Sequence, residues 1–493
     1  MNILVLSDFF RLGGLENHII TFYEATKAEN RYCFCFGEYE DVGILKCDRI
    51  YSGFHFSFQA TVAELIEDVE RLLTIIREEK IDVIHVHPWY AIFPAYFAAN
   101  IAEVKLVCTY HVTTSANFTC TVFDQIMYEE IISSSVSAIY CVNKYGIDTF
   151  SGMGEKNTCF LPNPVDLKQY EVSALPGNRK WALVSRIDSD KYPGVEKAIR
   201  MLPDLDIDQV DVYGNGNCFT QLEDLVKETS ARVELKGFSP DMGKSLKGNY
   251  DGVIGVDRVA IEALTMGIPV LLAGYSKVCG LISQEDYPKL RQCNFVPIEF
   301  REKTPEEINA EIKDMYQNRD RYVFPEAVRK DYDVRELAGQ YLRVLKNSDY
   351  KGSREYVKKF YHDLKRCETE TFFHNSDFTW ELAKKYLQPA TNSMNVKRLF
   401  MLNDQLILKE KETAALRGRI DALEKNLMEA DRKLGEADRK LSEVDRKLSE
   451  TDWLMTELKR SIRKQVSDIS SFTVQRNNMR ILKAVLKEKL SRK

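Results

Sequence analysis

Short apolar runs alternate with longer segments of helical periodicity along roughly the first two thirds of the chain. In the first half of this region the runs cover residues 2–8, 83–87, 105–111, 138–143 and 158–162. Each is apolar at consecutive positions, as in a strand buried on both faces, and the connections are long enough to hold helices. The alternation predicts a parallel, doubly wound α/β sheet.

A polar segment at residues 164–180, broken at Leu175-Pro176-Gly177-Asn178, separates these runs from a second series. The second series covers residues 180–187, 209–214, 233–238, 251–256 and 269–274. An amphipathic helix with Leu337, Tyr341 and Leu345 on one stripe follows it. We therefore predict two doubly wound domains and a helix that joins them. Their bounds are an N-terminal domain at 1–165, a C-terminal domain at 178–330 and a crossover helix at 331–347.

Residues 416–462 show the most regular pattern of the chain, with apolar residues at alternating steps of four and three. Residues 429–449 repeat a unit that begins Glu-Ala-Asp-Arg-Lys-Leu or Glu-Val-Asp-Arg-Lys-Leu. In a parallel pair of helices the Lys and Asp of successive units would face each other across the seam. This predicts a coiled coil at 396–465 and a homo-oligomer formed through residues 416–462. The alternative is a single charged helix held by pairs such as Glu429 with Lys433.

Two other C-terminal segments have no such period. Residues 348–395 are polar, aromatic and helix-prone, and we predict a helical linker there. Residues 466–493 are predicted to form a basic terminal helix, in which 479–493 place Lys and Arg around four aliphatic residues. This end suits contact with a membrane surface, and it equally suits a solvated helix.

The charges and cysteines limit the possible functions. The 69 Lys and Arg against 74 Asp and Glu leave a net charge of −5, which argues against a nucleic-acid binder. The 11 cysteines form no C-x-x-C motif, and their odd number does not suit a disulfide framework. The first apolar run has the length of a strand and lacks the basic residues of a signal peptide, while the uncharged segment 83–102 contains Pro88 and Pro94. We therefore predict a cytoplasmic protein without a membrane span.

Candidate ligand-binding residues of the N-terminal domain lie where strands end, because the carboxyl ends of parallel strands line the crevice of such folds. Gly13 and Gly14 lie between the first strand and a helix, so their N–H groups can meet an anion, although such a turn is also common as a structural feature. His111 ends a later strand, where it can hydrogen-bond a ligand hydroxyl. His85 and His87 share one face of a strand, but no third ligand lies at metal-binding spacing, and we predict no metal there.

In the C-terminal domain the first strand leads into Arg186 and Lys191. Two cations at a strand end are suited to neutralising a departing diphosphate without a metal ion, and the alternative is a solvated charged loop. Gly214 and Gly216 form a glycine turn after the next strand.

A later strand of the same domain turns through Asp257 and Arg258 into a short helix that contains Glu262. The helix is predicted to end at Gly267-Ile268-Pro269. A carboxylate on such a helix can accept hydrogen bonds from two hydroxyls of a ribose.

Taken in order, these motifs resemble those of the family 4 glycosyltransferases, retaining enzymes with the GT-B fold, over about residues 1–347. The segment Leu161-Pro162-Asn163-Pro164-Val165-Asp166 and the block Glu-Ala-x-x-x-Gly-x-Pro-Val at Glu262 belong to the same resemblance. It implies three catalytic residues, which contact the transferred sugar or its diphosphate: His111, Arg186 and Lys191. The donor-binding residues are Gly13, Gly14, Gly214, Gly216, Asp257, Arg258 and Glu262.

The resemblance also implies a fold class and a reaction. The fold class is α/β with the GT-B arrangement, two Rossmann-like domains that face a cleft, here followed by a helical coiled coil. The implied enzyme is a retaining hexosyltransferase that uses a UDP- or GDP-sugar, needs no metal or other cofactor, and holds a saccharide or lipid-linked acceptor on its N-terminal domain. Related bacterial enzymes build surface polysaccharides, which places the expected site of action at the inner face of the cell membrane as a peripheral protein.

One position departs from the family pattern. Eight residues before Glu262, where the family usually has a glutamate, this chain has Ile254. That departure favours an alternative function, a catalytically degenerate transferase-like scaffold that recruits a partner enzyme through its coiled coil. A nucleotide-sugar hydrolase or epimerase on the same plan is a third possibility.

Overall fold

The computed structural model describes most of the chain, and the account below concerns these residues. They are 1–11, 13–40, 43–87, 89–111, 122–152, 157–351, 355–366, 377–390, 394–430 and 446–462.

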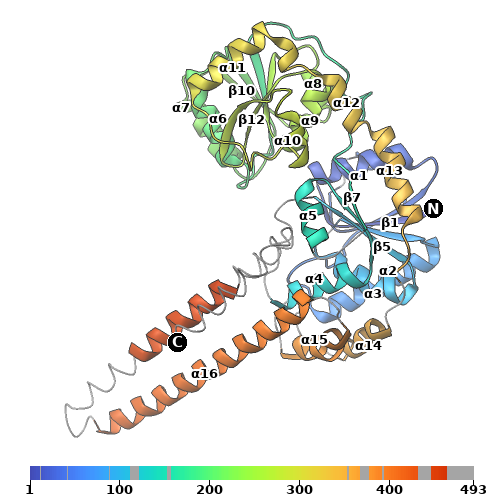
Figure 1. The fold of residues 1–493 in the computed structure, drawn as a ribbon, viewed down its shortest axis with the longest axis vertical. Coiled ribbons are helices and arrows are strands. Elements are labelled where there is room, and N and C mark those ends of the chain that lie inside the picture. The colour runs from blue at the N-terminus through green and yellow to red at the C-terminus, as the bar shows by residue number, and fades with distance from the viewer. Residues whose placement is uncertain are drawn as a thin grey trace.

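The N-terminal domain is built on a seven-stranded parallel sheet with the strand order β3-β2-β1-β4-β5-β6-β7 (Figure 1). Its strands are β1 (Asn2–Phe10), β2 (Arg31–Tyr39), β3 (Ile50–Tyr51), β4 (Val83–His87), β5 (Lys105–Tyr110), β6 (Val136–Cys141) and β7 (Thr158–Phe160). Its helices are α1 (Gly14–Thr26), α2 (Val62–Glu79), α3 (Ile92–Ala102), α4 (Val122–Ser134) and α5 (Lys144–Gly152). The strand order reverses between β1 and β4, so the carboxyl ends of these two strands and their neighbours form the expected crevice.

The C-terminal domain contains a six-stranded sheet with the order β10-β9-β8-β11-β12-β13, in which only the β12–β13 pair is antiparallel. Its strands are β8 (Lys180–Val184), β9 (Gln209–Tyr213), β10 (Val233–Gly237), β11 (Gly252–Gly255), β12 (Val270–Gly274) and β13 (Lys277–Leu281). Its helices are α6 (Tyr192–Met201), α7 (Phe219–Glu228), α8 (Met242–Leu246), α9 (Asp257–Thr265), α10 (Tyr287–Gln292), α11 (Pro305–Gln317) and α12 (Pro325–Tyr332). The prediction of two doubly wound domains is confirmed.

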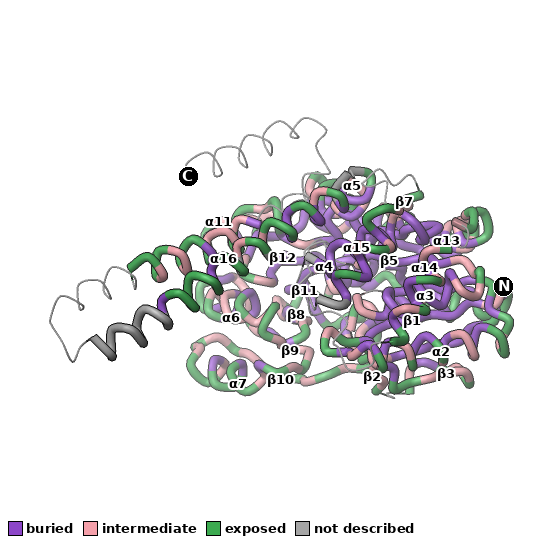
Figure 2. Tube along the Cα trace, turned by 90° about the horizontal axis from the view of Figure 1, so that it is seen from below, coloured by how far each residue is buried: buried purple, intermediate pink, exposed green. Residues whose placement is uncertain are grey.

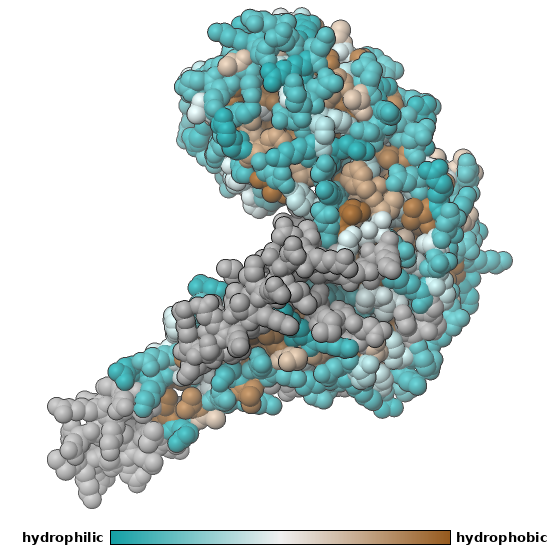
Figure 3. All heavy atoms as spheres, viewed as in Figure 1, coloured by the Kyte–Doolittle hydropathy of each residue, from teal (hydrophilic) through white to brown (hydrophobic). Residues whose placement is uncertain are grey.

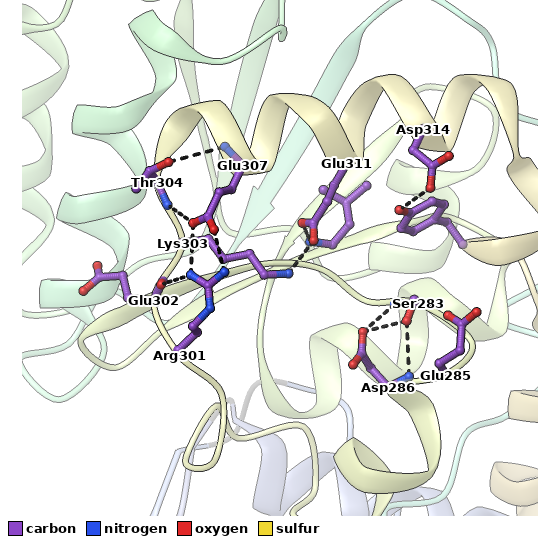
Figure 4. Close-up of polar contacts among 12 residues, drawn as sticks. Ser283, Glu285, Asp286, Arg301, Glu302, Lys303, Thr304, Glu307, Glu311 and Asp314 are labelled. Atoms are coloured by element: carbon purple, nitrogen blue, oxygen red, sulfur yellow. Dashed lines mark hydrogen bonds and ion pairs between the residues drawn. The ribbon is translucent and has the colours of Figure 1, made fainter.

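Local sequence signals explain where several helices begin. In front of α11 the Thr304 hydroxyl accepts from the Glu307 N–H at 3.4 Å, and the Glu307 carboxylate accepts from the Thr304 N–H at 2.9 Å (Figure 4). Arg301 adds two hydrogen bonds to the same carboxylate. Thr61 and Glu64 form the same capping box at α2. Such reciprocal caps satisfy N–H groups that a helix start leaves without partners.

The chain returns to the N-terminal domain through α13 (Val334–Asn347), as the predicted crossover helix requires. The ring of Tyr341 stacks on Phe22 of α1 with the centroids 5.0 Å apart, and its carbonyl accepts from the Tyr140 hydroxyl at 2.7 Å. Leu337 and Leu345 are buried in the same cluster. The two domains are therefore joined at both the 161–166 segment and α13.

Residues 348–395, expected as a helical linker, contain α14 (Glu355–Leu364) and α15 (Asp377–Ala390), which pack against the N-terminal domain (Figure 1). Phe360 is fully buried, and its ring meets Phe97 of α3 edge-on at 5.5 Å. The helix α16 (Met394–Ala430) begins in the same layer, where Phe400 lies 5.1 Å from Trp380. Buried residues recur along this part of the chain, with exposed and intermediate residues between them (Figure 2). The helical layer is thus part of the N-terminal core.

Beyond this layer α16 extends away from the domain, and the helical residues 446–462 run back alongside it (Figure 1). Arg417 of α16 contacts Asp452 at 2.6 Å, and Ile420, Met455 and Ile462 are buried. These contacts pair two segments of one chain, while residues 431–445 lie outside the described part. The homo-oligomer through 416–462 remains a prediction. The basic helix predicted at 466–493, with its membrane contact at 479–493, also lies outside the described residues. Among the helices that are described, none has an apolar stretch long enough to span a bilayer.

Candidate active site between the two domains

Figure 3 shows a hollow in the molecular surface between the two domains. Arg258 of α9 donates to the hydroxyl of Thr21 on α1 at 3.2 Å. The Tyr145 hydroxyl, on the N-terminal side, donates to the Glu299 carboxylate of the other domain. These contacts bring together the loops that the motifs singled out.

The Gly13-Gly14 turn lies between β1 and α1, with Gly13 as the residue before the first helical turn. A Cβ on Gly13 would lie 2.7 Å from Oε2 of Glu16, whereas Gly14 has open space around it. Glu16 is buried, and its carboxylate accepts from the Arg11 N–H at 3.2 Å. Burial raises the pKa of Glu16, and the backbone N–H of Glu16 itself is the first of the groups that oppose this rise. The charge of Arg186, across the cleft, also lowers this pKa, which places the helix start within the field of that cation.

Four of the seven histidines gather at the carboxyl ends of β4 and β5. His111 Nε2 lies 2.8 Å from His87 Nδ1, and the His18 ring meets His111 edge-on at 4.8 Å. His85 is held by Tyr341 at 2.9 Å and by Thr109 at 2.7 Å. Burial lowers the pKa of His85 and His111 to about 3, and the pKa values of His18 and His87 also lie well below their ordinary range. The cluster is therefore neutral at physiological pH.

His18 was not singled out by the sequence, because a histidine inside a helical period carries no positional signal of its own. Its Nδ1 lies 3.0 Å from Oδ1 of Asn163, and Asn163 Nδ2 donates to Oδ1 of Asn294 at 2.9 Å. Asn163 belongs to the Leu-Pro-Asn-Pro-Val-Asp segment, and Asn294 lies in the C-terminal domain. A buried hydrogen-bond chain thus connects α1 to the opposite domain.

The two predicted cations lie at the mouth of the C-terminal sheet. Arg186 is half-exposed, with Nε 3.3 Å from Asp188 and Nη2 2.9 Å from Asp190. Lys191 Nζ contacts Asp257 Oδ2 at 2.6 Å, and both of these side chains are mostly buried. Both cations therefore have carboxylate partners, and the partners of Arg186 are open to solvent and to exchange with an anionic ligand.

The Gly214 turn after β9 packs directly on the segment that carries Arg186. Gly214 has φ +143°, and a Cβ there would lie 1.8 Å from the carbonyl oxygen of Ser185. A Cβ on Gly216 would lie 2.4 Å from the backbone of Ile187. Only glycine fits this approach, which fixes the loop after β8 against the turn after β9.

The departure at Ile254 lies in the strand before α9. Ile254 belongs to β11 and is buried in the core of the C-terminal domain. The strand passes through Asp257, at φ +54°, directly into the helix. Arg258 Nε donates to Glu262 at 2.6 Å, with both side chains nearly buried. Burial raises the pKa of Glu262, and Arg258 and the Tyr170 hydroxyl oppose this rise.

The structure therefore brings the predicted residues into three neighbouring groups. Arg186 and the Lys191–Asp257 pair lie at the ends of β8 and β11, the Arg258–Glu262 pair reaches α1, and His111 lies in the histidine cluster. Within the described ranges, no three His, Cys, Asp or Glu side chains are arranged to hold a metal ion. That the reaction needs no metal remains a prediction.

A surface cavity of about 420 Å³ opens at the carboxyl ends of β1 and β2. Arg11, Glu38, His55 and the aromatic side chains Phe9 and Phe54 line it. Sequence reasoning did not identify this cavity, since its walls come from the ends of β1 and β2, the start of α2 and the 54–59 loop, none of which carries a motif.

Comparison with known proteins agrees with this geometry. Residues 12–169 match the sequence profile of Glycosyltransferase Family 4. Phosphatidyl-myo-inositol mannosyltransferase of Mycobacterium tuberculosis is 26% identical over 182 residues, which are 33% of this chain and 45% of that protein. The chain thus spans less than half the length of the curated relatives it matches.

Solved structures extend the likeness over both domains. Anabaena HepE in complex with UDP superimposes with a TM-score of 0.54 at 17% identity, covering 70% of this chain and 100% of that one. Sucrose-phosphate synthase from Thermosynechococcus elongatus gives a TM-score of 0.53 at 14% identity, covering 71% of this chain and 100% of that one. The fold is that of the GT-B glycosyltransferases. The resemblance to glycosyltransferase family 4 that the motifs indicated is thereby confirmed.

Proposed function

We propose that the chain is a retaining hexosyltransferase that moves a sugar from a UDP- or GDP-sugar to an acceptor hydroxyl. The observation that supports the proposal is the position of Arg186, whose charge lowers the pKa of Glu16 at the start of α1, with Lys191 in the same loop after β8 held by Asp257. HepE, which shares the fold, was solved with UDP and with UDP-glucose. A diphosphate entering here would meet two fixed cations and the N-terminus of a helix.

The proposed mechanism follows from how these cations are held. Of the two partners of Arg186, Asp190 is exposed and Asp188 is partly exposed, so the guanidinium can exchange them for phosphate oxygens. Lys191 is positioned by Asp257 and adds a second charge, which stabilises the diphosphate as the glycosidic bond breaks. His111 is neutral and accepts from or donates to a sugar hydroxyl without adding charge.

Donor binding also requires a rearrangement. Glu262, the proposed ribose ligand, is already paired with Arg258. The ribose hydroxyls must share the carboxylate with the guanidinium or replace it. The proposed donor residues Asp257 and Arg258 would then turn toward the sugar.

The acceptor is proposed to bind on the N-terminal domain, as a saccharide or a lipid-linked saccharide. The mycobacterial relative is by name a mannosyltransferase for phosphatidyl-myo-inositol, which supports a lipid-linked acceptor. Synthesis of cell-surface polysaccharide by a cytoplasmic enzyme, peripheral at the inner membrane face and self-associated through its coiled coil, is part of the same proposal.

The test is incubation with a panel of UDP- and GDP-sugars, with and without lipid-linked saccharide acceptors, while nucleotide release is measured. Release that requires an acceptor, with the product's anomeric configuration retained, supports the transferase. Release without an acceptor indicates a hydrolase. No release with any donor contradicts the transferase and favours the scaffold, to which the Ile254 departure and the Arg258–Glu262 pair both point.

A further inference from the structure

His18 contains a buried polar atom for which the structure shows no partner. Its side chain is 1% exposed, and Nε2 makes no hydrogen bond to any residue that the structure describes. A buried nitrogen without a partner costs free energy in the folded protein, and a ligand that supplies a donor would recover it. The atom lies one turn into α1, beside the proposed sugar ligand His111.

The hydrogen-bond chain across the domains fixes what this nitrogen can do. Asn163 Nδ2 donates to Asn294, so its Oδ1 is the atom that faces His18 Nδ1. An amide oxygen only accepts, and Nδ1 of His18 must therefore hold the ring proton. Burial keeps the pKa of His18 well below its ordinary value, and the charge of Arg258 lowers it further, so the ring is neutral. Nε2 is then a lone-pair acceptor that requires a donor.

A complementary group without a partner lies on the facing helix. Nη1 of Arg258 is buried and makes no hydrogen bond, while Nη2 of the same guanidinium reaches Thr21. Thr21 follows His18 by three residues, so both lie on the same face of α1. Both atoms are buried, and the Arg258–Thr21 contact brings the guanidinium to the face of α1 that carries His18. A sugar hydroxyl, which donates and accepts at once, matches this pair.

We propose that His18 Nε2 accepts a hydrogen bond from a free hydroxyl of the transferred hexose, and that Arg258 Nη1 donates to the same or the adjacent hydroxyl. This inference rests on the proposed function and assigns to His18 a role in donor selection. A donor in which this hydroxyl is missing or substituted is discriminated against, because the buried nitrogen then stays without a partner.

The test compares sugar nucleotides with free nucleotides by titration calorimetry on the full chain. The probes are UDP, UDP-glucose, GDP and GDP-mannose, and the proteins are wild type, His18→Leu and His85→Leu. His85 is the matched control, because it belongs to the same buried cluster but both of its ring nitrogens have partners inside the protein. We expect His18→Leu to weaken the preference for the sugar nucleotide over the free nucleotide about five- to tenfold. The affinity of His18→Leu for UDP and GDP should be the same as that of the wild type. His85→Leu should keep the wild-type preference for the sugar nucleotide over the free nucleotide.

Donor analogues give a second measurement that does not depend on how well the variant folds. In a deoxyfluoro UDP-glucose or GDP-mannose, the fluorine can accept from Arg258 but cannot donate to His18. At one position of fluorination, the affinity of the wild type for the sugar nucleotide should fall by about the same factor. The affinity of His18→Leu should not fall further. An unchanged preference in His18→Leu, or equal losses in wild type and variant at every fluorinated position, overturns the inference and leaves the proposed function intact. If wild type binds none of the four nucleotides, the proposed function fails and the inference fails with it.

Discussion

Truncation within the C-terminal helices tests whether the helical layer belongs to the N-terminal core. The first turns of α16 contribute Val396, Leu399 and Phe400, all fully buried. A chain that ends at residue 395 loses these three side chains, and one that ends at residue 412 keeps them. Full burial of an aliphatic or aromatic side chain stabilises by about 1.5–3 kcal/mol, so the shorter chain should lose about 5–9 kcal/mol. The total free energy of unfolding of such a domain is about 5–15 kcal/mol, so we expect the shorter chain to be largely unfolded in this region.

Urea unfolding followed by tryptophan fluorescence measures the effect, since Trp380 packs directly on Phe400. Two neighbouring substitutions in the full chain provide the matched control. Phe400→Ala should cost about 3–5 kcal/mol, whereas Met401→Ala, at a side chain 64% exposed, should change the free energy of unfolding by less than about 0.5 kcal/mol. Equal unfolding midpoints for the two truncated chains would refute the reasoning.

Three further predictions concern the site and the core. Arg186→Ala and Lys191→Ala should each lower turnover by orders of magnitude without unfolding the protein, as nucleotide-release assays and circular dichroism would show. Gly214→Ala should destabilise by at least about 3 kcal/mol, because its Cβ would overlap a carbonyl oxygen at a φ of +143°, and thermal unfolding measures this. Burial raises the pKa of Glu129 from 4.5 to about 7. The protonated carboxyl therefore stabilises the folded state by about 3 kcal/mol below about pH 4.5, and this contribution is lost as the pH rises through 7. Glu129→Gln should remove this dependence in urea titrations at pH 5 and pH 8.

Matched variants separate these effects from general damage. Arg200→Ala removes an exposed, ion-paired arginine from α6 and should leave turnover unchanged. Gly339→Ala adds a methyl group in open space on α13 and should stabilise slightly. Turnover that survives both cation variants, a Gly214→Ala protein as stable as wild type, or equal pH slopes for wild type and Glu129→Gln would each contradict the corresponding argument.

The sheets could be predicted from the sequence because continuous apolar runs require burial on both faces, and that burial occurs wherever such a run lies in the fold. The motifs likewise predicted that Arg186 and Lys191 lie just after a strand, as they do after β8. Residues 348–395 show no clear period, so the buried face of α14 and its partner on α3 required the structure. A helical period indicates that a helix has a buried face, but it does not indicate which element packs against that face.

One part of the site depended on contacts between distant residues. His18 meets Asn163 and His111 only once the N-terminal domain has folded, and no local pattern encodes that meeting. The pairing of Arg258 with Glu262, by contrast, has the i,i+4 spacing of helical ion pairs and could have been expected from the sequence. The missing glutamate at Ile254 was visible in the sequence, whereas the short passage from β11 into α9 required the structure.

The anchoring of α16 in the N-terminal domain has a mechanical consequence. The helix leaves the core after about residue 403 and continues to Ala430, a rod of roughly 40 Å at 1.5 Å per residue. A rod rooted in one domain moves as a rigid extension of that domain. If the two domains move relative to each other, the far end of α16 keeps its distance from the histidine cluster and changes its distance from Arg186. A molecule held at that end would therefore stay in register with the N-terminal domain.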